Sequence, residues 1–186
     1  MNPEAFQKSE PSAFRTAFHA AKAAVAKIEP EKAWRVDSSY TDEDYADMDC
    51  FVTKGGSTVA VHHGDIVSVC KHPDDAEVTG SDLLEFARSQ GGKKLDAFAG
   101  LYGFYTRNGF EPVSYCEFAD VEGIRPPDWV RGRDDPEPVI FFKYTGRTRG
   151  EIWKDHGELS QEYVTRNKPA EGYREAQKIR DDSLEE

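Results

Sequence analysis

The chain has 186 residues, of which 38% are hydrophobic and 15 are glycines, and this composition is that of a folded globular protein rather than a disordered one. Its net charge of −11 disfavours sequence-independent binding of DNA or RNA, because the phosphate backbone is also negative, and would attract cationic substrates such as amines. No apolar run reaches the length of a membrane span, no cationic-then-apolar leader opens the chain, and three cysteines without a Cys-x-x-Cys pair predict free buried thiols in a reducing cytoplasm.

The first third of the chain begins with a helical pattern. Residues 11–28 form one apolar face at spacings of three and four, which predicts an amphipathic helix that ends before Pro30. Residues 33–36 are a short strand candidate. Residues 41–46 are predicted to be a brief helix with Thr41 as its N-cap.

Three strands then follow closely, at residues 49–53, 57–62 and 65–70, and the two turns between them contain glycine. This spacing predicts an antiparallel meander. The third strand is almost continuously apolar, so we expect it to be central and covered on both faces.

Helices and strands alternate in the rest of the chain. The expected elements are a helix at 80–90, a strand at 93–98, a helix at 100–108, strands at 112–119 and 139–144, and a charge-dense helical tail at 147–186. The fold class is therefore α+β: a mixed, mostly antiparallel sheet of roughly seven strands flanked by helices. The tail is expected to pack on the domain or on a second subunit of a homodimer, and the sequence leaves both open.

The helix at 100–108 ends in the pattern Phe104-Tyr105-x-x-x-Gly109-Phe110. This pattern resembles the Tyr-x-x-x-Gly-Phe signature of the GNAT superfamily of N-acetyltransferases, and the order of the elements is similar to that of the family. The pattern around residues 64–69 and 91–98 also looks similar to acetyltransferase-like proteins carried by phages and mobile elements. The resemblance implies an acyl-CoA-binding domain at residues 1–146, with an N-terminal helix that is extra to the family fold, and a helical C-terminal extension at 147–186.

The resemblance implies a direct transfer of an acetyl group from acetyl-CoA to a small cationic amine or a protein amine. Acetyl-CoA would enter where the strands at 65–70 and 93–98 part. Tyr105 would be the general acid that protonates the departing thiolate. The backbone of Val69 and Lys71 would hold the pantetheine arm and polarise the thioester carbonyl.

The amides of Thr79, Gly80, Ser81 and Asp82 would hold the pyrophosphate at a helix N-terminus. The family loop at this place reads Gln/Arg-x-x-Gly-x-Gly/Ala, and only Gly80 matches it, because Asp75 and Val78 occupy the other two positions. Phe98 similarly replaces an asparagine that often contacts the pantetheine. These departures favour a second hypothesis, in which the fold is retained as a binding or regulatory module without turnover.

The remaining candidates carry weaker patterns. His62, His63, Asp65 and Glu117 are candidates for the general base, although such residues in turns are usually only solvated. Asp128 and Trp129 are candidates for an acceptor-site wall. Cys50 and Cys70 with the nearby histidines lack the paired spacing of a zinc site. Tyr105 itself has a structural alternative, because aromatic residues on an amphipathic helix usually belong to the core, as Phe104 and Leu101 of the same helix are expected to do.

Overall fold

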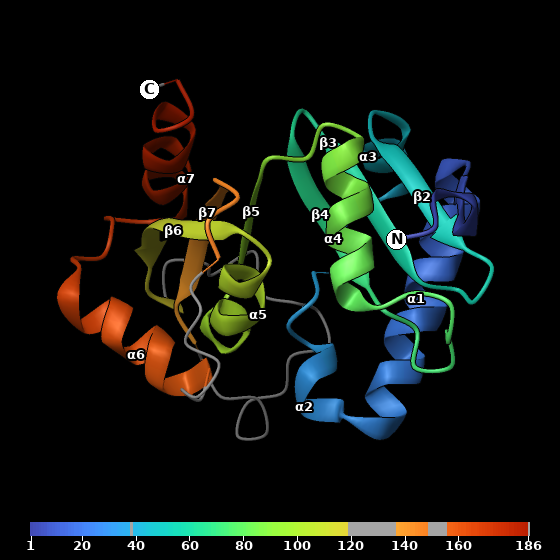
Figure 1. Cartoon of the computed structure of the whole chain (residues 1–186), viewed down its shortest axis with the longest axis horizontal. Helices are drawn as coiled ribbons and strands as arrows, with labels where there is room; N and C mark the ends of the chain where they lie inside the picture. The colour runs from blue at the N-terminus through green and yellow to red at the C-terminus, as the bar shows by residue number, and fades with distance from the viewer. Residues whose placement is uncertain (38, 119–136, 149–155, 186) are drawn as a thin grey trace. The chain divides into compact units, whose positions relative to one another are not determined.

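The computed structural model describes residues 1–37, 39–118, 137–148 and 156–185. These residues form two compact units, one within residues 1–93 and the other beginning at Lys94 (Figure 1). The described residues contain seven strands, and the pairs within each unit are antiparallel, so the expected α+β class with a mostly antiparallel arrangement is confirmed. No helix among the described residues combines the length and the apolar content needed to cross a bilayer.

The first unit is built on four antiparallel strands in the order β1–β2–β3–β4. Their bounds are β1 Phe6–Lys8, β2 Asp49–Thr53, β3 Thr58–His62 and β4 Asp65–Cys70. The helices of this unit are α1 Pro11–Ile28, α2 Pro30–Ala33, α3 Asp42–Ala46 and α4 Gly80–Ser89. The predicted meander is therefore present, and the β3–β4 turn is made by His63 and Gly64, both at positive φ (49° and 84°), as a two-residue hairpin turn requires.

Two expectations for the first unit are wrong. The helix at 11–28 is not an extension ahead of the first strand, because β1 precedes it and pairs with β2. Residues 33–36 do not form a strand; they finish α2 and the turn that follows it. A three-residue strand with one buried side chain, Phe6, is too short to produce a recognisable alternation, and this is why β1 was missed.

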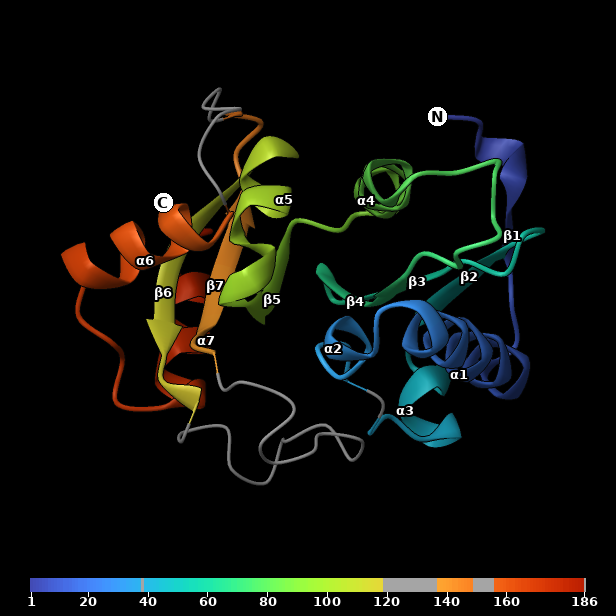
Figure 2. The ribbon, with the colours of Figure 1, turned by 90° about the horizontal axis from the view of Figure 1, so that it is seen from below.

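Helices cover both faces of this sheet, as Figure 2 shows for α1 and α4. On one face, Phe14 and Phe18 of α1 pack with Tyr45 of α3 and with apolar residues of β2, β3 and β4. On the other face, Phe86 of α4 stacks on Phe6 with ring centroids 3.9 Å apart and meets Phe51 edge-on at 4.9 Å. Both α1 and α4 also contact β4, as expected for a strand with helices on both sides, but its residues alternate between half-buried and buried.

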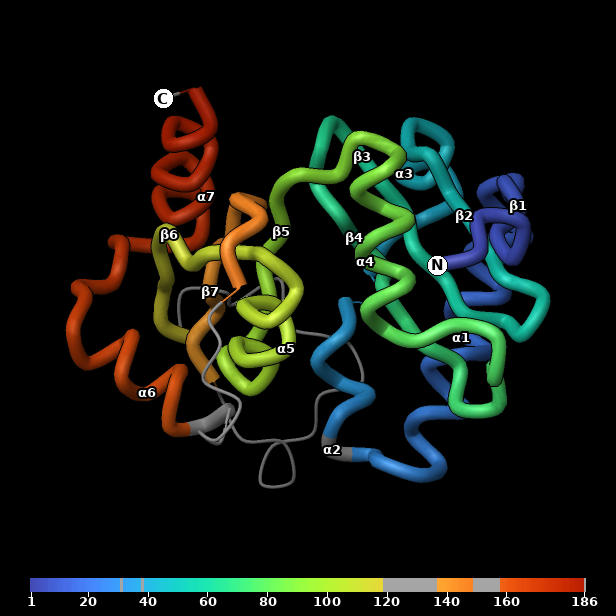
Figure 3. Tube along the Cα trace, viewed as in Figure 1, coloured from blue at the N-terminus to red at the C-terminus, as the bar shows by residue number. Residues whose placement is uncertain are grey.

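The second unit is a three-stranded antiparallel sheet in the order β5–β7–β6. The strands are β5 Lys94–Phe98, β6 Phe110–Cys116 and β7 Val139–Tyr144, and the helices are α5 Tyr102–Arg107, α6 His156–Arg166 and α7 Tyr173–Asp182. Figure 3 traces the chain from α5 directly into β6.

Neighbouring residues of β7 face opposite sides of this sheet. Phe142 lies against Tyr102 and Tyr105 of α5, with ring centroids 5.9 and 5.5 Å apart, whereas Phe141 meets Tyr173 of α7 edge-on at 4.9 Å. α5 and α7 therefore cover opposite faces of the second sheet.

Polar contacts attach α7 to the same sheet. Ser114 donates from its hydroxyl to the carbonyl of Ala176 at 2.6 Å, and Tyr173 donates to Asp96 at 2.9 Å. The last helix of the segment that we expected as a C-terminal extension is thus part of the core of the second unit.

Candidate functional site

β4 contains a bulge at the place where the sequence predicted the thioester contacts. Thr58 of β3 pairs with Cys70, but Ala60 pairs with Val67, so that β4 has one residue more than β3 over this stretch. Ser68 and Val69 together lie opposite Val59. Ser68 is at φ 51°, in the left-handed region, which costs a residue with a side chain about 1–2 kcal/mol.

Two other elements hold Ser68 in this conformation. The Tyr45 hydroxyl of α3 is 2.7 Å from the Ser68 hydroxyl, and the Thr58 hydroxyl donates to the Ser68 carbonyl at 3.0 Å. Burial raises the pKa of Tyr45 to about 12, so its phenol is neutral and able to hydrogen-bond at physiological pH. A strained residue that is held from both its side chain and its carbonyl is typical of functional backbone.

The two residues predicted to contact the thioester through their backbone, Val69 and Lys71, therefore lie in an irregular strand and directly after it. Val69 is half-buried inside the bulge. Lys71 follows the end of the strand, and its ammonium group donates to the carbonyls of His72 and Asp75 at 2.9 and 2.5 Å. Nothing in the sequence around Ser68 indicated the bulge, because the run Ile66-Val67-Ser68-Val69-Cys70 reads as a regular strand.

Asp75 lies inside the protein rather than at the surface of the loop after β4. Its side chain is 2% exposed and accepts hydrogen bonds from Thr53 at 2.5 Å, from Ser57 at 2.7 Å and from the amide of Glu77 at 3.1 Å. Burial alone would raise the pKa of this carboxyl, but these hydrogen bonds and the charge of Lys71 outweigh it, and the pKa is lowered. Asp75 thus ties the loop to the β2–β3 turn.

Ser57, His72 and Asp75 lie together but do not form a hydrolytic triad. The Ser57 hydroxyl donates directly to Asp75, and it accepts from the backbone amide of His72 rather than facing the imidazole. The imidazole Nδ1 accepts instead from the amide of Asp74 at 3.2 Å. Ser57 is 0% exposed, so its oxygen is closed to a substrate.

The N-terminus of α4 carries the four residues predicted to hold the pyrophosphate. Thr79 and Asp82 form a reciprocal capping box: the Asp82 carboxylate accepts from the Thr79 amide at 2.7 Å, and the Thr79 hydroxyl accepts from the Asp82 amide at 3.1 Å. The amides of Gly80 and Ser81 lie in the first helical turn, where no carbonyl of the helix can accept from them. Two of the four predicted amides are thus occupied by the chain itself.

Tyr105 lies on the buried face of α5. Its side chain is 7% exposed and its ring lies near Phe110 and Phe142, with centroids 6.2 and 5.5 Å away. Burial, with a smaller contribution from the charge of Asp96, raises the pKa of its phenol well above the usual value. The helix presents its residues differently from our expectation, since Tyr102 and Tyr105 are buried whereas Phe104 and Leu101 are only half-buried.

The glycine of the Tyr-x-x-x-Gly-Phe pattern has a local structural reason. Gly109 is at φ +84°, directly after the last turn of α5, and a side chain there would approach the Tyr144 ring to 2.8 Å. Its carbonyl accepts from the amides of Thr145 and Gly146 at 2.9 and 3.1 Å. Gly109 therefore ends the helix and joins it to the end of β7.

Of the remaining candidates, His62, His63 and Asp65 lie together at the β3–β4 turn, where Asp65 pairs with His62 across the hairpin. The imidazole rings of His62 and His63 lie 4.3 Å apart at the β3–β4 turn, and Glu117 is exposed after β6. Asp128 and Trp129 lie outside the described residues. Among the residues that the structure describes, no three side chains of His, Cys, Asp or Glu are grouped so as to hold a metal ion.

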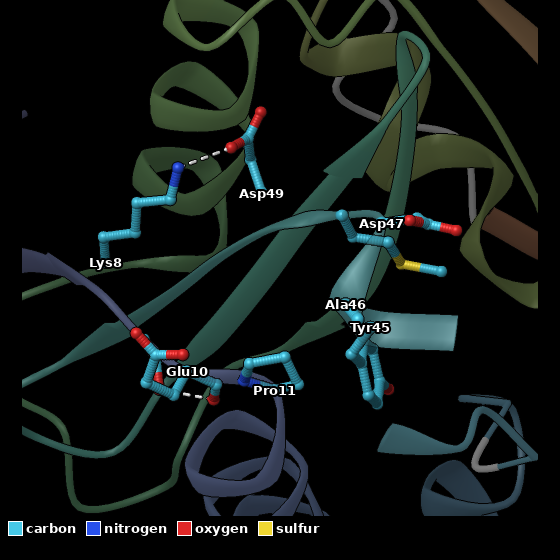
Figure 4. A pocket seen from close by; sticks show the side chains of 9 residues that line it. Lys8, Glu10, Pro11, Tyr45, Ala46, Asp47 and Asp49 are labelled. Atoms are coloured by element: carbon cyan, nitrogen blue, oxygen red, sulfur yellow. Dashed lines mark hydrogen bonds and ion pairs between the residues drawn. The ribbon is translucent and has the colours of Figure 1, made fainter. Parts of the chain in front are cut away.

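A cavity of about 470 Å³ lies elsewhere in the first unit, between β1, the start of α1 and the α3–β2 connection (Figure 4). Glu10, Asp47 and Asp49 contribute carboxylates to its lining, and Lys8 pairs with Asp49 at 2.8 Å. Both partners of this pair are more than half exposed, so it is a solvated surface pair. None of the predicted site residues lines this cavity, although Tyr45, which holds the bulge, does.

No model of a protein family, no curated protein and no solved structure matches the chain. The bulge and the capped α4 N-terminus lie in the first unit and Tyr105 lies in the second, and each bears on function by its own local geometry.

Proposed function

We propose that the protein is a GNAT-like N-acyltransferase that transfers an acetyl group from acetyl-CoA directly to an amine. The observation that carries this proposal is the bulge at Ser68 and Val69, held by Tyr45 and Thr58 at the place where the resemblance implies the thioester contacts. The position of β1 supports the proposal further. Because β1 precedes α1, this helix is not an addition ahead of the first strand, and the order of elements is closer to that of the GNAT superfamily.

In the proposed reaction the nitrogen of a neutral amine attacks the carbonyl carbon of the thioester. The new C–N bond forms and the C–S bond breaks, the departing thiolate takes the phenolic proton of Tyr105, and the proton that the attacking nitrogen gives up restores the Tyr105 phenol. Burial raises the pKa of Tyr105, so the phenol carries its proton at physiological pH but is a weaker acid than an exposed phenol. Backbone amides around Val69 and Lys71 would polarise the carbonyl, and because they belong to a restrained strand they need little reorganisation.

A second function is favoured by the N-terminus of α4. The Asp82 carboxylate accepts there from the amide and the hydroxyl of Thr79, which lowers the pKa of Asp82, so the chain itself occupies groups that would otherwise face a phosphate. This favours a GNAT-like binding or regulatory module that does not turn over acetyl-CoA.

A thermal-shift titration with acetyl-CoA tests whether the protein binds the donor that the transferase requires. A ligand at about 100 times its Kd stabilises the folded state by about 2.7 kcal/mol, which is readily seen as a shift in Tm. An unchanged Tm at millimolar acetyl-CoA would exclude the transferase.

The variant Tyr105→Phe then tests the acid. It removes one hydroxyl and leaves the ring contacts with Phe110 and Phe142, so we expect an unchanged Tm and acetyl-CoA affinity but a roughly 10²-fold lower kcat. Tyr102→Phe, on the same buried face of α5, is the matched variant. If only Tyr102→Phe loses turnover, Tyr102 rather than Tyr105 is the acid. If both variants turn over as fast as the parent protein, neither tyrosine hydroxyl takes part in the mechanism.

A further inference from the structure

The β3–β4 turn brings two histidine rings together. Successive residues of a strand point to opposite faces of the sheet, so neighbouring histidines in a regular strand would lie apart. Here the chain turns at the end of β3, where His63 is at φ 49° and Gly64 is at φ 84°. The ring centroids of His62 and His63 lie 4.3 Å apart, with the ring planes inclined by 47°. The turn therefore places side by side two imidazoles that a straight strand would separate.

The separation of the two rings is close to that of two imidazoles bound to one metal ion. A metal–nitrogen distance of about 2.0–2.1 Å places the centre of each ring about 3.2 Å from the ion. The two centres then lie about 4.5 Å apart at a bond angle of about 90°, and about 5.2 Å apart at the tetrahedral angle. The observed 4.3 Å is nearer to the first value. Bond angles of this size are those of the tetragonal sites that Cu²⁺ and Ni²⁺ prefer.

The two rings are accessible, and a carboxylate lies across the hairpin from one of them. His63 is exposed and His62 is half-buried, so an ion can reach both rings and a ring can turn towards it. Asp65 pairs with His62, and residues directly opposite each other in an antiparallel pair point to the same face. The charge of Asp65 favours a cation there, whereas Lys93, whose aliphatic carbons lie beside Gly64, adds one positive charge to the same turn.

We propose that His62 and His63 together bind a divalent ion of the Cu²⁺ and Ni²⁺ class at the β3–β4 turn, with water completing its coordination. Two protein ligands are consistent with the finding that the described residues contain no group of three ligating side chains. The proposal goes beyond acetyl transfer and does not depend on it. It assigns the two histidines to metal binding rather than to the deprotonation of an amine.

Isothermal titration calorimetry of the full-length chain with Ni²⁺ tests the proposal. We expect one Ni²⁺ ion per chain and no binding of Mg²⁺, because Mg²⁺ prefers carboxylate and water oxygens to imidazole. His62→Gln removes one imidazole. His63→Asn removes the other and retains the turn, because Asn-Gly is a preferred pair in this type of hairpin turn.

Each variant should weaken Ni²⁺ binding by at least about tenfold, because the second imidazole binds at the high effective concentration that the turn provides. The matched control is His19→Gln, which removes an exposed histidine of α1 in the same unit and should leave the Ni²⁺ affinity unchanged. Circular dichroism of the metal-free variants shows whether each one is folded.

Electron paramagnetic resonance of the Cu²⁺ complex gives a readout that a loss of stability would not reproduce. We expect hyperfine coupling to two imidazole nitrogens in the parent protein and to one in either variant. If the parent protein binds no Ni²⁺, or if His62→Gln and His63→Asn bind it as tightly as the parent does, the proposal is wrong. Equal affinities for Mg²⁺ and Ni²⁺ would assign the ion to carboxylates and would also overturn the proposal. Because the calorimetry and the spectrum of the parent protein need no variant, they test the site even if a variant does not fold.

Discussion

Replacing Asp75 should destabilise the first unit strongly, because this carboxylate is buried and has several donors. One oxygen accepts from the hydroxyls of Thr53 and Ser57, and the other accepts from the amide of Glu77. A hydrogen bond to a charged group contributes about 1.5–3 kcal/mol, and removing one partner leaves the others buried without an acceptor. The three contributions are not additive, and we expect Asp75→Ala to lower the free energy of unfolding by about 3–5 kcal/mol.

Asp75→Asn separates charge from shape. The side-chain oxygen of Asn can still accept from Thr53 and Ser57, but its amide nitrogen then faces the amide of Glu77, which loses its acceptor, and the negative charge is removed. We expect a loss of about 2 kcal/mol for this variant at pH 7. The matched control is Asp74→Asn, the exposed neighbour in the sequence, which should change the free energy of unfolding by less than about 0.5 kcal/mol.

The pH dependence gives an independent check. Because the pKa of Asp75 is lower in the folded protein than in the unfolded chain, its ionised form contributes stability above the unfolded value of about 3.9. This contribution is lost as the pH falls through the lowered, folded-state pKa. Urea unfolding of the parent protein and Asp75→Asn should therefore show a gap in unfolding free energy at pH 7 that narrows below about pH 4. A gap no larger than that of Asp74→Asn, or one that does not depend on pH, would refute the buried carboxylate as the anchor of the loop.

Two further predictions concern the bulge and the helix stop. Tyr45→Phe removes the hydroxyl 2.7 Å from Ser68, and should cost about 1 kcal/mol in urea unfolding and speed amide exchange in β4; unchanged exchange there would mean that Tyr45 does not hold the bulge. Gly109→Ala places a side chain at φ +84° and 2.8 Å from the Tyr144 ring, and should lower the free energy of unfolding by about 1–3 kcal/mol. The control is Gly91→Ala, at φ +91° with open space around it, which carries only the backbone part of that cost. Equal losses of unfolding free energy in the two variants would mean that the Tyr144 ring moves aside without cost.

Local patterns were sufficient where neighbours in the sequence decide the structure. The spacing of Phe14 and Phe18 predicted α1, Thr41 was correctly identified as the N-cap of α3, and Gly109 was correctly identified as the end of α5. The same capping pattern, Thr79-x-x-Asp82, is also present in the sequence and could have shown that the start of α4 carries its own anion.

The amino-acid sequence by itself determined the α+β class, the antiparallel meander and most helix boundaries, because periodicity, caps and turns act over a few residues. Only the tertiary structure decided that β1 pairs with β2, that Ser68 adopts a left-handed conformation and that Asp75 lies inside the protein. Each of these depends on partners far along the chain: the Tyr45 hydroxyl lies 23 positions from Ser68, and Thr53 lies 22 positions from Asp75. The physical reason is that a strained backbone or a buried charge is stable only when distant residues supply its hydrogen bonds, and no local pattern records which residues those are.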